Sequence, residues 1–593
     1  MLEKQTIRAD FCVVGGGIAG LCAAIAAARH GAKTVLMHER PVLGGNASSE
    51  IRMWVCGAQG ENNRETGIVE ELALENLYRN PTKNYYIWDT VLYDFARREP
   101  NLTLLLNCAC MDAATEQGAF ANGRTVRIRS VTGYQMTTQT MVTVEAGLFA
   151  DCSGDSILAP LTGAECRVGR EAAAEFDEVT TTAAQDRQTM GMSCLIQARE
   201  TDRPVAFTPP AWRTDLLHTD LGRRPGSLRN SGENYWYLEL GGDRDSIHDT
   251  EKIAAELIPL ALGTWDYIKN SGRYDAANWD LDFLGFLPGK RESRRMMGEY
   301  LVTQRDISAG RTYPDTVAYG GWPLDDHYPG GFWHPGHPNT NYHTPAPYPM
   351  PYRALYSRNV ENLFFAGRNI SVTHMALSSA RVMLTCGLFG QAVGTAAAIA
   401  ARRGLTPHGV YASALHELQQ TLLNDDCFLP GFTRDRSPRC ADAACTVHGA
   451  LRDGIDRVHA IYGNEACGRA VPNGQAAEYR FAQPEPVAAV HVVFDSDLNR
   501  VTLPGDWCEK YHPTRANVPL DAPQMHLPAT LCRSFVLEAE YADGRTARLL
   551  DETDNRRRAY DVPVQAPVRR LTLIPRENWG GTAQTTVFSF DFR

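Results

Sequence analysis

The sequence predicts an α/β protein that ends in an all-β domain. An apolar strand runs into a glycine-rich turn and an alanine-rich helix near residue 11, and two later strands, near residues 148 and 362, end in small and charged residues. These patterns are typical of a Rossmann-like parallel sheet that binds a dinucleotide. Beyond residue 441, short segments of alternating apolar and polar residues predict a β-sandwich. A chain of 593 residues exceeds the size of a single core, so we expect several domains.

The first strand and turn have the sequence FCVVGGGIAG, residues 11–20. Gly15 allows a tight turn, Gly17 lets the backbone approach a phosphate, and Gly20 lets the helix pack on its strand. The helix that begins at Ile18 and Ala19 then points its unpaired N–H groups at the ligand. The segment therefore predicts a cradle for a nucleotide pyrophosphate.

An acidic residue follows the predicted second strand, residues 34–37. Glu39 lies 19 residues after Gly20, where a carboxylate can accept hydrogen bonds from an adenosine ribose. A carboxylate favours a free 2′-hydroxyl over a phosphate, so FAD or NAD is expected and NADP is disfavoured. The alternative is an ordinary α/β corner with a solvated Glu39.

Two distant segments bear on the choice between FAD and NAD. LFADCSGD, residues 148–155, is an apolar strand that ends in small and acidic residues. NLFFAGRNISVTHMALSSARVMLTCGLFGQ, residues 362–391, combines a short strand, a turn and a long helix. Together with four further features, these segments resemble the FAD-dependent oxidoreductase family: GGGIAG, Glu39, ERPVLGGNASSEIRM at residues 39–53 and RESRR at residues 291–295. This family has a glutathione-reductase-like flavin fold and is related to succinate dehydrogenase and fumarate reductase flavoproteins.

The resemblance covers roughly residues 8–400 and implies a noncovalent FAD, because GGNASSEIR lacks the histidine of covalent relatives. Many relatives have AGD where this chain has Gly367, Arg368 and Asn369, so we expect ribityl or pyrophosphate contacts from Arg368 or Asp155. The FAD-binding residues implied in this way are Gly15, Gly17, Ile18, Ala19, Gly20, Glu39, Arg40, Gly44, Gly45, Asn46, Ser48, Arg52, Asp151, Ser153, Gly154, Asp155, Gly367, Arg368 and Asn369.

The domain map follows from these segments. Residues 1–160 and 350–405 are predicted to form one discontinuous FAD-binding domain, because the last segment must return to the sheet that begins at Phe11. Residues 161–349 form an inserted α+β substrate domain. Residues 406–440 are expected to be a helical linker, and residues 441–593 a galactose-binding-like β-sandwich that binds glycans or serves a structural role.

Composition indicates a large enzyme that acts on a small molecule. The net charge of −10 and the absence of a basic stripe argue against a nucleic-acid partner. Residues 1–10 do not resemble a signal peptide, and we interpret the apolar segment after Gly390 as a core helix rather than a membrane span. We expect a cytoplasmic protein without a membrane partner, with a homo-oligomer as an option.

The candidate catalytic residues are a histidine and several arginines. His374, six residues after Arg368, is the predicted base, since a histidine pKa near 6.5 suits removal of a hydroxyl proton. The alternative is a structural histidine. Arginine binds or polarises rather than serving as an ordinary base, and the candidates for that role are Arg294, Arg353 and Arg52, followed by Arg295 and Arg381.

The middle section holds six of the ten tryptophans, and residues 319–351 are rich in Gly, Pro, His and aromatic residues. This segment contains four histidines: His327, His334, His337 and His343. Their spacing fits no familiar zinc pattern, so no metal is predicted, although a metal site is an alternative. Aromatic faces beside polar side chains are typical of a sugar site.

The leading hypothesis is therefore oxidation of a secondary CH–OH group of a sugar or glycoside to a ketone, by hydride transfer to flavin N5. One alternative is reduction of an activated C=C bond, as in fumarate reductase. Another is a glycan-binding protein with a vestigial flavin fold. The sequence does not identify the sugar or the electron acceptor.

Overall fold

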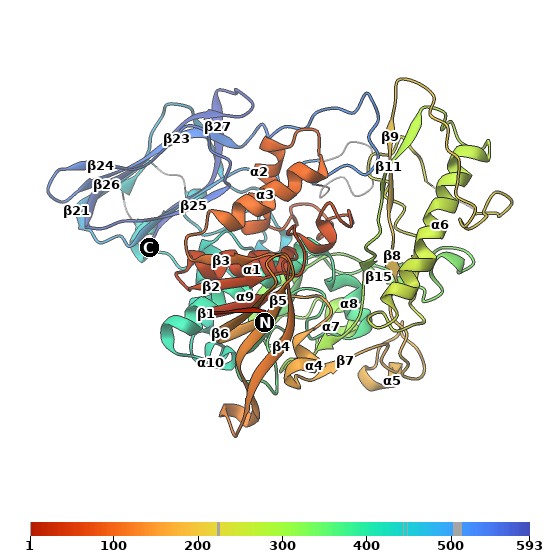
Figure 1. Cartoon of the computed structure of the whole chain (residues 1–593). Coiled ribbons are helices and arrows are strands. Elements are labelled where there is room, and N and C mark those ends of the chain that lie inside the picture. Colours follow the sequence, from red (N-terminus) through yellow and green to blue (C-terminus); the bar gives the residue numbers. More distant parts are fainter. Residues whose placement is uncertain (1, 222–223, 225, 443, 447–448, 502–512) are drawn as a thin grey trace. The chain divides into compact units, whose positions relative to one another are not determined.

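The computed structural model describes residues 2–221, 224, 226–442, 444–446, 449–501 and 513–593 (Figure 1). Two compact units are present. Unit 1 contains the described residues of Met1–Gln59, Thr82–Leu418 and Val501–Gln524, and unit 2 those of Gly60–Pro81, Gln419–Arg500 and Met525–Arg593. The predicted α/β fold class, with a C-terminal all-β region, is confirmed.

The central sheet of unit 1 brings the three motif strands together. β1 (Glu3–Val14), β6 (Thr140–Asp151) and β18 (Leu363–Phe365) are parallel neighbours, and Val14 and Phe365 both pair with Asp151. The carboxyl ends of these strands therefore meet at one edge, where ligands of such sheets bind. The other strands of the sheet are β2 (Thr34–Met37), β3 (Leu102–Leu105), β4 (Cys108–Gln117) and β5 (Val126–Gln135), in the order β3-β2-β1-β6-β5-β4.

Two alanine-rich helices of unit 1 pack backbone against backbone. A Cβ atom on Gly390 would overlap the carbonyl oxygen of Ala19, and one on Gly394 would overlap that of Ala23. These glycines therefore allow α9 (Met383–Arg403) to lie directly on α1 (Ile18–Arg29). α9 is long and apolar enough to cross a membrane, but 94% of its most apolar stretch is buried within the fold, which suits a core helix.

The middle section of unit 1 has its own core around α6 (Thr250–Asn270), which includes Tyr235, Trp265 and Trp279. Its strands are short, as expected for a section with little regular pattern: β7 (Cys166–Arg167), β8 (Met192–Ser193), β9 (Ile196–Glu200), β10 (Glu239–Leu240), β11 (Trp279–Leu284), β12 (Gly289–Lys290) and β13 (Arg295–Met296). The short helices are α4 (Leu158–Thr162), α5 (Ala173–Phe176) and α7 (Gln304–Ser308).

The aromatic segment 319–351 contains more regular structure than the sequence suggests. β14 (Thr316–Gly320) pairs with β17 (Tyr348–Pro351), and between them β15 (Leu324–His327) pairs with β16 (Asn339–Tyr342), both antiparallel. α8 (His374–Ala380) contacts β15. Further helices of the chain are α3 (Tyr85–Arg97), α10 (Pro407–Ser413), α11 (Leu415–Asn424) and α12 (Pro438–Asp442).

Unit 2 contains a β-sandwich together with helical segments. One antiparallel sheet has the order β19-β21-β26-β23-β24 and the other β20-β27-β22-β25, and residues of both sheets share a core that contains Tyr479, Phe494, Phe535 and Phe590. The strands are β19 (Ala444–Cys445), β20 (Arg469–Pro472), β21 (Ala477–Glu485), β22 (Ala489–Phe494), β23 (Cys532–Tyr541), β24 (Thr546–Glu552), β25 (Ala559–Pro563), β26 (Val568–Asn578) and β27 (Gln584–Phe592).

One helix of unit 2, α2 (Ile68–Arg79), lies within residues 1–160, which were predicted to belong to the FAD-binding domain. Its Glu70 accepts two hydrogen bonds from Arg500, both 2.7 Å long, and both side chains are buried. Burial raises the pKa of Glu70, but Arg500 outweighs burial and keeps the pKa below its ordinary value. This buried ion pair is one of the contacts that join residues 60–81 to the rest of unit 2.

The contact between α1 and α9 generates the first prediction. Gly390→Ala places a Cβ against the backbone of Ala19, so we expect the helices to separate and the protein to lose about 1–3 kcal/mol of stability. Gly147→Ala is the control, because its Cβ would lie 3.6 Å from the nearest atom, the carbonyl oxygen of Asp10. Chemical denaturation of both variants measures the difference. Equal stability of the two variants would contradict the prediction.

Candidate active site

The glycine-rich turn forms a cradle that leaves room at one position. Gly15 has a positive φ of 104°, and a Cβ there would overlap the carbonyl oxygen of Cys152. Gly20 packs against the carbonyl oxygen of Gly15 in the same way. By contrast, a Cβ on Gly17, the N-cap of α1, would meet no atom within 4 Å. Two glycines therefore serve packing, and the third faces open space in front of a helix N-terminus.

A cavity of about 800 Å³ begins at this cradle. Most of the residues that the resemblance implied for FAD line it: Gly15, Gly17, Ile18, Ala19, Glu39, Arg40, Gly44, Gly45, Asn46, Ser153, Gly154, Asp155, Gly367 and Arg368. Five do not line it, namely Gly20, Ser48, Arg52, Asp151 and Asn369. Three of the five support the wall: Ser48 donates to Gly45 O at 2.7 Å, and Asp151 accepts from Leu158 N at 2.8 Å and from Asn369 Nδ2 at 3.2 Å.

Glu39 carries a negative charge at one end of the cavity. Burial raises its pKa, but the neighbouring His38 and Arg40 outweigh burial and lower the pKa to about 2. Its Oε2 lies 3.1 Å from His38 Nδ1. Glu39 is thus an ionised acceptor at the end of the second strand, in the position that we predicted for a ribose contact.

A cluster of charges surrounds Asp155 in the middle of the cavity. Its carboxylate accepts hydrogen bonds from Arg368 Nη2 and Lys290 Nζ, each 2.8 Å long, and from Ser293 Oγ at 2.8 Å. Burial raises the pKa of Asp155, but the two cations outweigh burial and keep it below its ordinary value. Arg368 Nε is buried without a hydrogen-bond partner within the described part of the chain. Because two cations, Arg368 and Lys290, share one carboxylate, the cluster carries an excess positive charge that suits a bound pyrophosphate.

The other end of the cavity is built by the aromatic segment. β15 and β16 contribute Asp325, His327, Asn339, Asn341 and Tyr342, together with neighbouring residues that include Trp322 and His343. The predicted binding segment therefore does line the cavity. His334 stacks on Tyr328 with ring centroids 3.8 Å apart and, like His337, is not among the lining residues. Among the described residues, no group of three or more His, Cys, Asp or Glu side chains is arranged to hold a metal ion.

His327 lies between two carboxylates in this wall. Its Nδ1 is 2.6 Å from Glu239 Oε2, and its Nε2 is 3.4 Å from Asp325 Oδ2. Burial and the nearby Arg291 lower the pKa of His327, but Glu239 and Asp325 together outweigh them, so the pKa lies above its ordinary value. Glu239 also lies 3.3 Å from Arg291, and Asp325 accepts from Arg381 at 3.0 Å. Each carboxylate therefore holds two cationic or ionisable partners.

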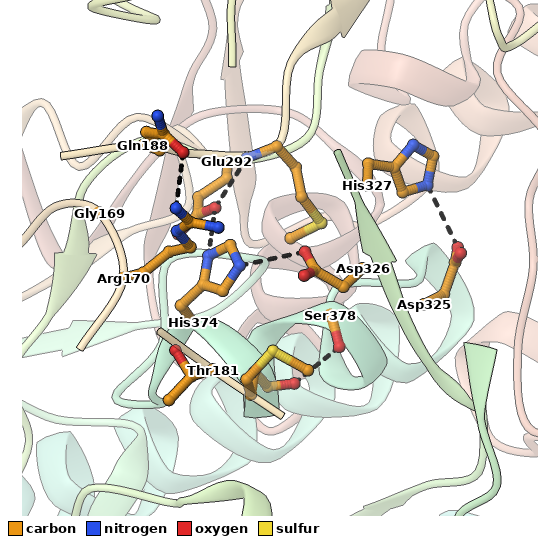
Figure 2. A network of polar contacts seen from close by, with 12 residues as sticks. Gly169, Arg170, Thr181, Gln188, Glu292, Asp325, Asp326, His327, His374 and Ser378 are labelled. Carbon is orange, nitrogen blue, oxygen red and sulfur yellow. Dashed lines mark hydrogen bonds and ion pairs between the residues drawn. The ribbon is translucent and has the colours of Figure 1, made fainter. Parts of the chain in front are cut away.

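His374, the predicted base, lies outside the cavity lining and is buried. Figure 2 shows its ring between Glu292 and Asp326: Nδ1 lies 2.8 Å from Glu292 Oε2, and Nε2 lies 3.1 Å from Asp326 Oδ1. Burial lowers the pKa of His374, but the two carboxylates raise it to about 10. At neutral pH the ring is therefore protonated and both nitrogens are occupied.

Of the predicted catalytic arginines, Arg381 lines the cavity, whereas the other four lie outside the lining: Arg52, Arg294, Arg295 and Arg353. Arg52 is buried, donates to Gln197 Oε1 at 2.9 Å and stacks on Phe283 with its guanidinium carbon 4.1 Å from the ring centroid. Arg353 makes a bidentate pair with Asp315, at 2.9 and 3.0 Å, and Arg294 donates to Asp155 O at 3.3 Å. Their catalytic roles stay predictions.

Sequence reasoning missed several lining residues. Arg291 is the first residue of the RESRR segment and Cys152 lies inside DCSGD, so their motifs located them without indicating their roles, and Lys290 directly precedes RESRR. Met53 ends the segment of residues 39–53 and was located in the same way, whereas Trp54 and Trp236 also line the cavity and lie outside the motifs. Glu239 was missed because it lies 88 residues from its partner His327.

The fold and this cavity define a flavoprotein of the dinucleotide-binding α/β class. The sequence matches the model of the family described as FAD dependent oxidoreductase over residues 10–422, more than half of the chain, and the chain therefore belongs to this family. FAD is its cofactor. The open space at Gly17, the unpartnered Nε of Arg368 and the ionised Glu39 all fit a bound FAD.

No curated protein matches the sequence significantly. Among solved structures, the chain is similar to quinol fumarate reductase FrdA of E. coli, with 13% identity over 71% of this chain and 75% of that chain and a TM-score of 0.28. It is also similar to a geranylgeranyl bacteriochlorophyll reductase-like protein of Thermoplasma acidophilum, with 11% identity, 71% and 84% coverage and a TM-score of 0.31. The family 32 carbohydrate-binding module of Streptococcus pneumoniae EndoD matches with 11% identity, 21% and 74% coverage and a TM-score of 0.15. These scores are low, and the family assignment rests on the sequence match.

The open space at Gly17 generates the second prediction. Gly17→Ala adds a methyl group that meets no protein atom, so we expect little change in the stability of the apoprotein beyond the N-cap preference of about 1 kcal/mol or less. FAD affinity should fall at least about tenfold, because the methyl group occupies the approach to the phosphates. Calorimetric titration of the apoprotein with FAD measures the affinity. Unchanged affinity would show that the pyrophosphate lies elsewhere.

Proposed function

We propose that this protein oxidises a secondary hydroxyl group of a sugar or glycoside to a ketone. The observation that carries the proposal is His327 in the cavity wall, 2.6 Å from Glu239 and next to Trp236, whose ring centroid lies 5.2 Å away. A proton acceptor and an aromatic face are therefore available at one place. Bound FAD supplies the centre that accepts the hydride.

The lining of this end suits a polar, ring-shaped substrate. Trp236, Trp322, Trp54 and Tyr342 offer aromatic surface, on which the C–H face of a sugar can pack. The polar lining groups Asn339, Asn341 and His343 can hydrogen-bond its hydroxyl groups. Aromatic faces with a few convergent polar groups are the usual composition of a small-molecule site.

The pair of His327 and Glu239 can take up the hydroxyl proton. In such a dyad the carboxylate orients the imidazole and stabilises the imidazolium that forms. The contact of Nε2 with Asp325 is 3.4 Å long, so this nitrogen is held loosely and a substrate hydroxyl can replace the contact. In this proposal the base is His327 rather than His374, because both nitrogens of His374 face carboxylates outside the cavity lining.

A second candidate is reduction of an activated C=C bond. Arg291 and Arg381 stand in the same wall as His327, so a protonated His327 gives three cations against the two carboxylates Glu239 and Asp325. A site with this balance can hold an anionic enoate while His327 delivers a proton to carbon. The pH dependence of the reaction distinguishes the two candidates.

The role of the β-sandwich and the setting of the reaction are also proposals. We propose that unit 2 is a galactose-binding-like module with a structural or glycan-binding role, and that the enzyme acts in the cytoplasm on a free small molecule. Neither a nucleic-acid nor a membrane partner enters the proposal, and a homo-oligomer is one option for its assembly. A glycan-binding protein with a vestigial flavin fold is disfavoured, because the cradle and the charges that suit FAD are all in place.

The substrate class is tested by an anaerobic titration of the purified holoenzyme with a panel of sugars and glycosides. We expect one class to bleach the oxidised flavin absorbance near ~450 nm, because hydride leaves the CH–OH carbon only when His327 can take the proton. Dithionite-reduced enzyme with an enoate is the matched reverse assay. Reoxidation by the enoate with no bleaching by any sugar would replace oxidation by C=C reduction.

The role of His327 predicts a pH dependence. Because Glu239 raises the pKa of His327, the neutral form that oxidation needs is reached only above pH 6.5, so flavin reduction should accelerate as the pH rises through this raised pKa. Glu239→Gln removes the carboxylate charge. The pH range over which the rate rises should therefore move to lower pH by about one unit or more. Stopped-flow absorbance measures the rate.

The second variant for this test is His327→Gln. It should abolish the rise of the rate with pH and slow flavin reduction about 10²-fold or more. For C=C reduction the sign is opposite, because the protonated form is the active one and the rate falls as the pH rises. A pH profile that is the same in both variants as in the wild type would remove His327 from the mechanism.

A further inference from the structure

Two segments of the cavity wall are β15 and residues 291–292. In each segment, residues that line the cavity alternate with residues that contact His374 instead. On β15, Asp325 and His327 line the cavity, whereas the intervening Asp326 contacts His374 (Figure 2). Likewise, Arg291 lines the cavity, whereas the next residue, Glu292, contacts His374. The same histidine therefore contacts both segments at the residues that do not line the cavity.

Two of the residues that line the cavity, His327 and Arg291, also share one buried partner. Glu239 Oε2 lies 2.6 Å from His327 Nδ1 and 3.3 Å from Arg291 Nη1. The segments are thus joined twice, by the anion Glu239 through the residues that line the cavity and by His374 through the residues that do not. Two such contacts fix both the separation of the segments and the direction in which His327 points.

The charge of His374 is needed for its contact. Both partners are carboxylates, so each ring nitrogen must donate, and only the protonated ring has two N–H groups. A cation at the first position of α8 is disfavoured by the helix dipole, and the carboxylates oppose this effect. The charged or titratable groups around the ring are Glu292 and Arg295 from residues 291–296, Asp326 and His327 from β15, and Glu171, Arg170 and Glu178 from residues 170–178.

The helix that carries His374 holds β15 at a second point. Arg381, the C-cap of α8, donates to the carbonyl oxygen of Asp325 at 3.1 Å and to its Oδ2 at 3.0 Å. The N-terminus of α8 is fixed in turn, because Glu171 Oε2 accepts from His374 N at 2.8 Å and Glu178 Oε1 accepts from Thr373 Oγ1 at 2.6 Å. β15 is therefore braced along its length by one short, anchored helix.

We propose that His374 is a positioning residue. It acts through Asp326 and Glu292 to hold His327 and Arg291 in contact with Glu239. This inference rests on the proposed role of His327. It gives His374 a part in the reaction that needs no contact with substrate. It also explains why a histidine at this position lies outside the cavity lining.

The test compares His374→Gln with His491→Gln in the holoenzyme. Gln keeps the size of His374 but carries no charge and presents its two N–H groups from a single nitrogen. His491 is the matched control, since it is buried in unit 2 and also lies near a carboxylate, 3.5 Å from Asp561. We expect FAD affinity to remain within about twofold of the wild type in both variants, because the pyrophosphate cradle is left intact.

The decisive measurement is the titration of His327 by NMR of holoenzyme labelled at histidine Cε1, with the resonance assigned through His327→Gln. In His374→Gln the pKa of His327 should fall by about one unit or more, because the His327 ring is no longer held in contact with the Glu239 carboxylate. Flavin reduction by the sugar should slow about 10- to 100-fold, as for a misplacement of about 1 Å. His491→Gln should change neither quantity.

Glu292→Gln is the second variant, and it keeps an acceptor for His374 Nδ1 while removing one charge. It should shift the pKa of His327 in the same direction by a smaller amount, and it preserves the test if His374→Gln does not fold. An unchanged His327 titration in a folded variant would overturn the positioning role. A shifted titration in an enzyme that no sugar reduces would retain the positioning role and reject the proposed substrate.

Discussion

The sharing of carboxylates between cations shapes the cavity of unit 1. Asp155 holds Arg368 and Lys290, Glu239 holds His327 and Arg291, and Asp325 holds Arg381 and His327. Removing one partner from such a group leaves a desolvated charge that costs several kcal/mol. Each carboxylate therefore fixes two side chains from different segments, and the wall keeps its shape because the charges must remain matched.

The local part of this design was predictable from sequence. The order of strand, glycines and helix at residues 11–20, and the acid at Glu39, depend on backbone geometry within about thirty residues, so the motif carries the information. The return of β18 to β6 was predictable for a related reason, because a strand, turn and long helix near residue 362 can complete the same sheet. The aromatic segment was located by composition, although its hairpin was not expected.

The remaining part depends on pairs that no local pattern encodes. His374 and Glu292 are 82 residues apart, and His327 and Glu239 are 88 apart. Because a histidine can be a base, a ligand or a buried cation, its role depends on partners that only the fold brings near. The same holds for Glu70, whose pairing with Arg500 places α2 in unit 2 across 430 residues of sequence.

The packing of α9 on α1 has a consequence for how the protein is made. Ala19 and Ala23 leave the ribosome early, but Gly390 and Gly394 complete their surroundings only after nearly four hundred residues have been synthesised. Until then the N-terminal strand and helix lack both β18 and α9, and contacts over such distances form slowly. FAD therefore meets a finished cradle only late in biosynthesis, and until then the apolar surfaces of the incomplete sheet are of the kind that favours aggregation.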